Sequence, residues 1–358
     1  MRKKIVVVGM SGGVDSSVAA LLLKEQGYEV IGVFMKNWEE VDEEGVCSAD
    51  LDYRDVISVA HALDIPYYQL NFSKKYWDTV FAKCLEDFKA GFTPNPDILC
   101  NKEIKFKVFF EKALELGADY VATGHYCQHM HLENKHYLAR GRDLEKDQSY
   151  FLYTMREKVL EKVLFPIGHL TKGEVRALAE GRGLVTAQKK DSTGICFIGK
   201  RDFREFLSRY ISKKPGNFET LSGEIVGQHE GVFFYTIGQR RGLGIGGKKD
   251  AQEDAWFVTG KSLEKNVVYV AQGGSHPALY AETLIATEES WVGAQPIFPL
   301  HCTAKIRYRA PDVACTILEH RDGRLHILFD EPQKAITARQ SIVFYRGDIC
   351  LGGAIIVD

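Results

Sequence analysis

The first half of the chain alternates short apolar runs with segments of helical periodicity. Apolar, β-rich runs lie at residues 5–9, 29–35, 67–70 and 120–123. Between the first two runs, residues 16–26 have the pattern of a helix, and Gly27 is placed as its C-terminal stop. This order is that of a βαβ unit, and its repetition predicts a parallel sheet covered by helices.

Two more helices are predicted in this half. Residues 104–116 place their phenylalanine and alanine side chains on one side, which is the spacing of an amphipathic helix. Thr171 and Glu174 have the spacing of a capping box ahead of residues 175–184. We therefore expect one more helix near the end of this domain.

After about residue 200 the pattern becomes that of an all-β region. Short apolar runs separated by glycine-rich turns lie at 224–226, 233–237, 256–258, 267–271, 313–318, 324–329 and 342–344. They predict a small β-rich central domain and a C-terminal β-barrel. The expected boundaries are 1–200, 201–270 and 271–358, and the glycine-rich stretch 242–249 is expected to be a mobile surface loop that becomes ordered on binding RNA.

Composition agrees with a globular protein of two or three domains, since 45% of the 358 residues are hydrophobic and 26% are charged. A formal net charge of -2 excludes a uniformly basic nucleic-acid binder. Lys and Arg nevertheless cluster at 102–107, 189–190, 213–214, 240–241, 248–249 and 305–309. A polyanion fits such a pattern on one face, although a solvated surface explains any single cluster equally well.

The sequence predicts a cytoplasmic protein without a membrane anchor. Residues 1–10 imitate a signal peptide, but the apolar run ends at Ser11, and no run approaches the ~20 residues of a membrane span. The eight cysteines form no Cys-x-x-Cys pair, so reduced thiols are expected and no metal site is predicted.

A candidate nucleotide loop follows the first predicted strand. It reads Ser11-Gly12-Gly13-Val14-Asp15-Ser16-Ser17 and leads into the first helix. Two adjacent glycines let the backbone take positive φ and turn its amides toward one point, and the helix adds its positive N-terminal end. Such a loop holds an anion like pyrophosphate, with hydroxyls from Ser16 and Ser17 and with Asp15 to orient Mg²⁺.

The loop lacks the lysine of a Walker motif. It resembles the pyrophosphate loop (PP-loop) of the N-type ATP pyrophosphatases, which adenylate a substrate oxygen. This resemblance implies a Rossmann-like nucleotide-binding domain that uses ATP with Mg²⁺. The implied nucleotide-binding residues are Gly9, Met10, Ser11, Gly12, Gly13, Val14, Asp15 and Ser16, with Met35 and Gly124 at the ends of two other strands.

Two cysteines lie in polar, turn-rich segments. Cys100 follows Asp97 by three residues, which brings thiol and carboxylate side by side on one helical turn. Cys196 lies in a glycine-flanked loop, where Lys189 and Lys190 would favour the thiolate. Buried thiols of no chemical role explain the other cysteines.

Five blocks of the sequence, in order, resemble the tRNA-specific 2-thiouridylase family almost from end to end. They are residues 95–102, 146–151, 191–199, 235–242 and 304–309, and the nucleotide loop precedes them. The resemblance implies that Cys196 receives sulfur as a persulfide from a donor protein, that Cys100 is the partner nucleophile, and that Asp97 is the acid/base. It also implies transfer RNA contacts at Asn95, Pro96, Asp97, Lys146, Asp147, Gln148, Arg307 and Tyr308.

On this interpretation, adenylation of O2 of the wobble uridine is followed by attack of sulfur at C2, which expels AMP. A disulfide between Cys100 and Cys196 would remain, and an external reductant would reset it. We expect a monomer.

Three alternatives remain open on the sequence. Another adenylating enzyme with the same loop, acting on a small molecule, explains residues 11–17 equally well. A non-catalytic RNA-binding protein explains the basic clusters. An iron-sulfur cluster held by Asp97, Cys100 and Cys196 would replace the persulfide.

Overall fold

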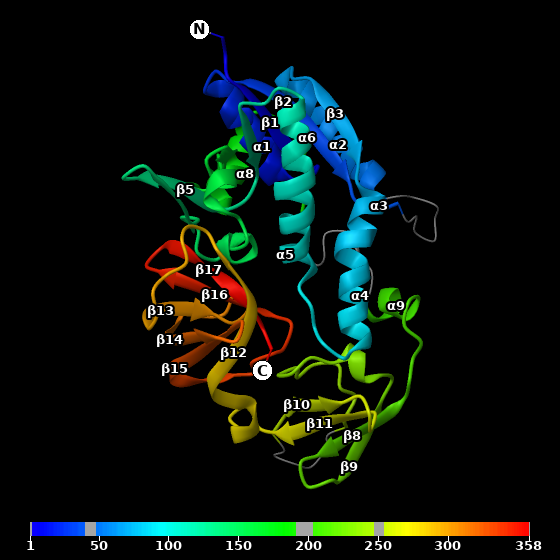
Figure 1. The fold of residues 1–358 in the computed structure, drawn as a ribbon. Coiled ribbons are helices and arrows are strands. Elements are labelled where there is room, and N and C mark those ends of the chain that lie inside the picture. The colour runs from blue at the N-terminus through cyan, green and yellow to red at the C-terminus, as the bar shows by residue number, and fades with distance from the viewer. Residues whose placement is uncertain (1, 40–47, 191–202, 247–253, 358) are drawn as a thin grey trace.

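The computed structural model describes residues 2–39, 48–190, 203–246 and 254–357. Its first part is a five-stranded parallel sheet with the order β3-β2-β1-β4-β7 (Figure 1). The strands are β1 (Ile5–Met10), β2 (Glu29–Lys36), β3 (Tyr67–Asn71), β4 (Tyr120–Thr123) and β7 (Val163–Leu164). The predicted parallel sheet is confirmed.

Helices cover both faces of this sheet. Alternate residues of β1 point to opposite sides, and the side chains on both sides are apolar and buried. Val6 and Val8 pack with α1 (Val14–Glu25), α2 (Ser48–Leu63) and α8 (Lys172–Gly181). On the other face, Val7 packs with α3 (Ser73–Tyr76), the π-helix η1 (Trp77–Phe81), α4 (Ala82–Lys89), α5 (Pro96–Cys100), the π-helix η2 (Asn101–Phe109) and α6 (Phe110–Glu115). Thr171 and Glu174 form the expected capping box of α8.

The central domain contains a four-stranded sheet with the order β10-β11-β8-β9. Its strands are β8 (Gly216–Thr220), β9 (Ile225–His229), β10 (Trp256–Ser262) and β11 (Val267–Gln272). Two predictions were wrong in detail here. Residues 232–234 form a 3₁₀ turn, η4 (Val232–Phe234), whose side chains are all buried, and a helix, α9 (Phe203–Ser208), precedes the sheet. A short apolar run does not distinguish a strand from a buried turn.

The C-terminal β-barrel is confirmed, and it is closed by the pairing of β12 with β17. Its strands are β12 (Tyr280–Trp291), β13 (Leu300–Lys305), β14 (Val313–Arg321), β15 (Arg324–Lys334), β16 (Ser341–Arg346) and β17 (Ile349–Ile356). A 3₁₀ turn, η5 (Pro277–Leu279), leads into β12. Arg307 and Tyr308, two of the predicted RNA contacts, lie in the turn that follows β13.

A hairpin from the first half of the chain extends the barrel sheet. It consists of β5 (Cys127–Leu132) and β6 (Lys135–Arg140), and β6 pairs with β17 through Leu138 and Ala139. This hairpin was not predicted from the sequence. Its polar, histidine-containing strands do not show the apolar pattern of a core strand, and their partner lies about two hundred residues away in sequence.

Buried polar contacts strengthen this junction between the sheet domain and the barrel. The 3₁₀ turn η3 (Ser149–Leu152) and the short helix α7 (Glu157–Leu160) follow β6. Tyr150 Oη donates to the carbonyl of Ser341 over 2.9 Å. Arg140 pairs with Asp312 at 2.7 Å and stacks on the Tyr345 ring. The two domains are therefore held in one arrangement.

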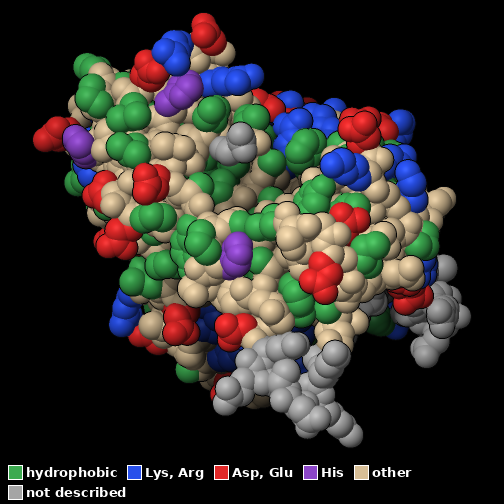
Figure 2. Space-filling view, turned by 90° about the horizontal axis from the view of Figure 1, so that it is seen from below, with side chains coloured by type: hydrophobic (Ala, Val, Ile, Leu, Met, Phe, Trp, Pro, Cys, Tyr) green, Lys and Arg blue, Asp and Glu red, His purple; other side chains and the backbone are tan. Residues whose placement is uncertain are grey.

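The surface agrees with the small net charge. On the face seen from below, Lys and Arg side chains are interspersed with Asp and Glu among apolar ones (Figure 2). Within the described ranges, no helix has both the length and the apolar composition needed to cross a bilayer.

Replacing Tyr150 with Phe tests the junction. The substitution removes the donor to the buried Ser341 carbonyl, so we expect the free energy of unfolding to fall by about 1 kcal/mol. Tyr68→Phe is the control, because Tyr68 is 50% exposed. Urea denaturation gives both values, and equal stability of the two variants would show that this hydrogen bond contributes nothing.

Candidate functional site

The nucleotide loop lies at the carboxyl end of β1, where the strand order of the parallel sheet reverses. Gly12 has φ +76°, and a Cβ there would lie 2.5 Å from the carbonyl oxygen of Asp52. Gly13 has φ -91° and forms the N-cap of α1 without a side-chain cap. The expected positive φ therefore holds for Gly12 alone, and the first amides of α1 remain available to an anion.

Hydroxyl groups hold the loop in shape. Ser16 Oγ accepts from the Ser11 amide at 3.1 Å and donates to the Gly13 carbonyl at 3.1 Å. Ser17 is fully buried, and its hydroxyl also donates to Gly13 O, at 2.8 Å. Our expectation that Ser17 offers its hydroxyl to a ligand was wrong, because a buried side chain that braces the loop does not face one.

Gly9, Met35 and Gly124 meet around this loop. A Cβ on Gly9 would lie 3.2 Å from the terminal methyl of Met35 and 3.3 Å from Phe109, which belongs to η2. A Cβ on Gly124 would lie 2.6 Å from the Ser16 amide nitrogen. The structure thus brings these three predicted residues together, and the helix that continues from Cys100 reaches the same edge. Met10 and Val14 are buried in the core and support the loop from behind.

Asp15 is occupied by neighbours that the sequence did not indicate. Lys172 Nζ contacts both of its carboxylate oxygens, at 2.8 and 2.9 Å, and Tyr126 Oη donates to Oδ1 at 2.7 Å. Lys172 is the first residue of α8, directly after the Thr171 cap. The capping pattern therefore predicted the helix, but it did not indicate that Lys172 pairs with Asp15. A lysine ammonium group beside an anion-binding loop is suited to meet phosphate charge.

Cys100 and Asp97 lie on α5, whose N-terminus is fixed by Asn95 and Pro96. Asn95 Oδ1 accepts from the amides of Asp97 and Ile98, and Pro96 occupies the first turn. The Cys100 thiol is 2% exposed. Burial raises its pKa to about 11, with Lys105 opposing the shift and the negative Asp97 adding to it. At neutral pH this thiol is therefore protonated beside a carboxylate.

Cys196, the predicted partner of Cys100, lies outside the described residues. Lys189, which was expected to favour its thiolate, is paired with Asp52 at 2.7 Å and Asp55 at 2.5 Å on α2. Its charge is thus shared with two carboxylates.

The remaining described cysteines are unbonded. Cys84, Cys127 and Cys350 are buried, as expected of structural thiols. Cys302 and Cys315 face each other on β13 and β14 with their sulfurs 3.8 Å apart, a pair that the sequence did not indicate.

The proposed RNA contacts converge from two domains. The ring centroids of Phe151 and Tyr308 lie 4.4 Å apart, with an angle of 48° between the rings, so the turn that contains Arg307 and Tyr308 lies beside η3. Arg307 donates to the Ala335 carbonyl, and its half-buried side chain is held in the turn. Tyr150 is fully buried, so packing explains this aromatic residue.

Asp147 and Gln148 also have structural partners. Asp147 is buried and accepts from Gly141 N at 3.1 Å and from Ser149 Oγ at 2.9 Å. Gln148 accepts from the Tyr126 amide at 2.9 Å. Asp147 thus shapes the turn, while Gln148 links it to the loop that follows β4. Their contact with RNA stays a prediction.

Comparison with known proteins gives matches over almost the whole chain. The family models described as "tRNA methyl transferase HUP domain", "tRNA methyl transferase PRC-barrel domain" and "Aminomethyltransferase beta-barrel domain" match residues 4–200, 204–272 and 281–356. The first of them alone matches more than half of the 358 residues.

Curated relatives carry a more specific name. The tRNA-specific 2-thiouridylase MnmA of Halalkalibacterium halodurans is 59% identical, over 98% of this chain and 94% of its own length. Those of Protochlamydia amoebophila and Staphylococcus aureus are 59% and 56% identical, each over 99% of this chain and 93% and 95% of their own lengths. Such identity across all three domains is more specific than a match to each domain separately.

Gly124→Ala tests the nucleotide loop. The new Cβ would meet backbone atoms of Asp15 and Ser16, so the loop must shift. We expect ATP to bind about tenfold more weakly, which corresponds to about 1.4 kcal/mol. Gly181→Ala is the control, since no atom lies within 4 Å of its added Cβ. Calorimetric titration with ATP measures both affinities. Equal affinity of the two variants would show that ATP binding does not need the close approach of Gly124 to Asp15 and Ser16.

The pH dependence of Cys100 alkylation tests the buried thiol. Thiolate is the reactive form, so the rate should rise about tenfold per pH unit and level off only near the raised pKa of about 11. Lys105→Met removes the charge that lowers this pKa, and so should slow the reaction at a fixed pH. The modified peptide is followed by mass. A rate that is already constant at pH 8 would contradict the assignment.

Proposed function

The chain belongs to the tRNA-specific 2-thiouridylase family, and from this premise we propose that it replaces O2 of a transfer RNA uridine with sulfur in an ATP-dependent reaction. It is an enzyme of the sulfurtransferase class. One observation of its structure carries the proposal: the helix that contains Cys100 runs on through η2 to Phe109, which contacts Gly9 at the nucleotide edge. The chain therefore leads from the thiol, through a kink at Phe106, to the edge of the sheet where the loop lies, and this link supports one site for both.

ATP is the substrate proposed for the loop. The amides at the start of α1 and the positive end of that helix suit its phosphates. Lys172 lies beside these amides because it pairs with Asp15 in the first turn of α1. Gly12 and Gly124 keep the backbone close enough for this approach. Uridine O2 would attack the α-phosphorus, so that pyrophosphate leaves and O2 becomes the oxygen of a good leaving group, AMP.

Mg²⁺ is proposed as the ion that accompanies ATP. Within the described ranges, no group of three or more His, Cys, Asp or Glu side chains is arranged to hold a metal. Asp15, the carboxylate of the loop, is shared with Lys172 and fits an outer contact to a phosphate-bound ion. An ion of this kind neutralises phosphate charge when bound.

Sulfur transfer is proposed to use Cys100 and Cys196. A donor protein loads Cys196 as a persulfide. The Cys100 thiolate attacks the inner sulfur of Cys196, which forms the Cys100–Cys196 disulfide and releases the outer sulfur as hydrosulfide. Hydrosulfide adds to C2 of the adenylated uridine and expels AMP. The two cysteines are oxidised and the transferred sulfur is reduced, so a dithiol reductant must restore them.

Asp97 is proposed to accept the thiol proton of Cys100. A buried, protonated thiol needs a base before it attacks, and a carboxylate one helical turn away supports this role for Asp97. The target base is proposed to leave its stack and enter beside Asn95, Pro96 and Asp97, at the start of α5. We also propose that the target uridine is at the wobble position and that the protein is a monomer. It would work in the cytosol, where thiols stay reduced.

The thiolation assay tests this function. Purified protein is incubated with ATP, Mg²⁺, unmodified transfer RNA and a persulfide donor, and digested RNA is searched by mass for 2-thiouridine. We expect product with wild type and a loss of at least about a hundredfold with Cys100→Ser or Cys196→Ser, since a serine hydroxyl cannot carry sulfur or form a disulfide.

Cys84→Ser is the matched control, because Cys84 is buried like Cys100 but lies on α4 and has no assigned role. It should retain activity. Full activity of Cys100→Ser would contradict the thiol mechanism, and iron and sulfide in an anaerobically purified active protein would point to a cluster instead. AMP formation on a small molecule, without thiouridine, would favour the other adenylating enzymes.

A further inference from the structure

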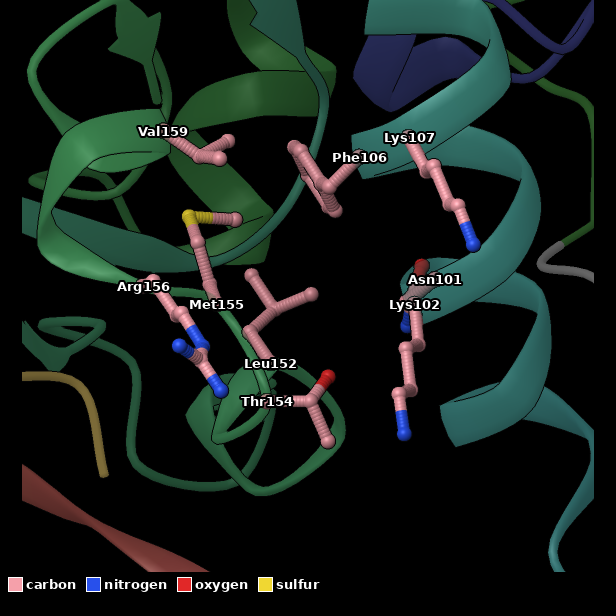
Figure 3. A pocket seen from close by; sticks show the side chains of 9 residues that line it. All are labelled: Asn101, Lys102, Phe106, Lys107, Leu152, Thr154, Met155, Arg156 and Val159. Carbon is pink, nitrogen blue, oxygen red and sulfur yellow. The ribbon is translucent and has the colours of Figure 1, made fainter. Parts of the chain in front are cut away.

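A cavity of about 230 Å³ lies between η2 and the segment that runs from η3 to α7 (Figure 3). It is lined by Asn101, Lys102, Phe106, Lys107, Leu152, Thr154, Met155, Arg156 and Val159. Its volume is below the roughly 300–1,000 Å³ of pockets for whole small molecules. A cavity of this size suits part of a larger ligand, such as a single base, better than a whole small molecule.

The rim of this cavity is basic on both sides. Lys102 and Lys107 extend from the helix and Arg156 from the facing segment, as Figure 3 shows. All three side chains are exposed. Lys107 is also paired with Glu103 at 2.8 Å. Three cations against one carboxylate leave a positive rim that attracts an anion such as phosphate.

The cavity wall combines apolar surface with one buried acceptor. Phe106, Leu152 and Met155 supply an apolar surface on which a planar base can lie. Asn101 is 3% exposed, and its amide nitrogen donates to the Phe151 carbonyl at 3.2 Å. Its Oδ1 is buried and has no hydrogen-bond partner in the described part of the chain. Buried acceptors rarely lack a hydrogen bond in native structures, and a ligand with a donor group would supply one to Asn101 Oδ1.

We propose that this cavity binds one nucleotide of the RNA substrate, next to the target uridine. Its phosphate lies against Lys102, Lys107 and Arg156, its base lies on the apolar wall, and a base N–H or ribose hydroxyl donates to Asn101 Oδ1. The proposal rests on the proposed function. RNA is favoured over a small free anion because the cavity combines a cationic rim with apolar side chains in its wall, the two features that a nucleotide matches together.

The cavity is distinct from the place of the chemical step. Cys100 packs with Ile104 and Phe109 on the side of η2 that faces the parallel sheet. Phe106 points to the other side, toward Leu152 and Met155. The target uridine must approach Cys100, so the nucleotide held here is a neighbour of the target. Because Asn101 directly follows Cys100, a nucleotide bound here also fixes the helix that carries the thiol.

Transfer RNA binding tests the proposal. The variant Lys102→Gln/Arg156→Gln removes two exposed cations from the rim. The control, Lys112→Gln/Lys158→Gln, removes two exposed cations from α6 and α7 that do not line the cavity. Affinity for unmodified transfer RNA is measured at several salt concentrations, and ATP affinity is measured separately without RNA.

We expect the rim variant to bind transfer RNA about tenfold or more weakly, with the slope of log affinity against log salt reduced by about 1 for each phosphate that the variant no longer neutralises. The control should keep nearly the wild-type affinity and slope, and ATP affinity should stay unchanged in both variants. An unchanged slope in the rim variant would overturn the proposal, as would a wild-type protein that binds no RNA. Thiouridine formation is measured independently. If the wild type forms thiouridine and the rim variant binds transfer RNA with the wild-type affinity and slope, the proposed function stands and only this subsite is rejected.

Discussion

The pairing of β6 with β17 is the constraint on which the arrangement of the molecule depends. It joins a hairpin that leaves the nucleotide-binding domain to the last strand of the barrel, through Leu138 and Ala139. A sheet ladder fixes both the separation and the orientation of its two strands. The Phe151–Tyr308 ring contact, the Arg307 turn and the wall formed by η3 and α7 all lie beside this junction, so their positions relative to the thiol follow from it.

A second constraint is the close approach of backbones at the carboxyl edge of the parallel sheet. Gly124 allows the loop after β4 to touch the start of α1, and Gly9 allows Met35 and Phe109 to touch the end of β1. Side chains at these positions would separate the elements that the proposed chemistry needs together. The helix from Cys100 to Phe109 consequently spans the distance between the thiol and the nucleotide edge, and a π-helical stretch, which is frequent at functional sites, begins directly after Cys100.

Local patterns predicted much of this architecture, because strands such as 5–9 and the capping box at Thr171 are written in neighbouring residues. Contacts between distant segments escaped prediction. The pairing of β6 with β17 and the ion pair of Lys172 with Asp15 join residues 157 or more positions apart, and no local periodicity encodes them. Burial was equally hidden: the sequence cannot tell that Ser17 and Asp147 turn inward. Motif matching located candidate residues, and only packing separates those that face a ligand from those that hold the site in shape.

The proposed chemistry requires a uridine oxygen as the acceptor of the adenylyl group. Burial raises the pKa of the Cys100 thiol, and Lys172 pairs with Asp15 of the loop. An enzyme of this design should release pyrophosphate from ATP only when a uridine is present to accept the adenylyl group. The most direct measurement is therefore pyrophosphate release from ATP with and without unmodified transfer RNA, with no sulfur donor present, so that AMP stays on the uridine. The account predicts pyrophosphate release that depends on the RNA and disappears when the target uridine is replaced by cytidine. Pyrophosphate release at the same rate without RNA would contradict it.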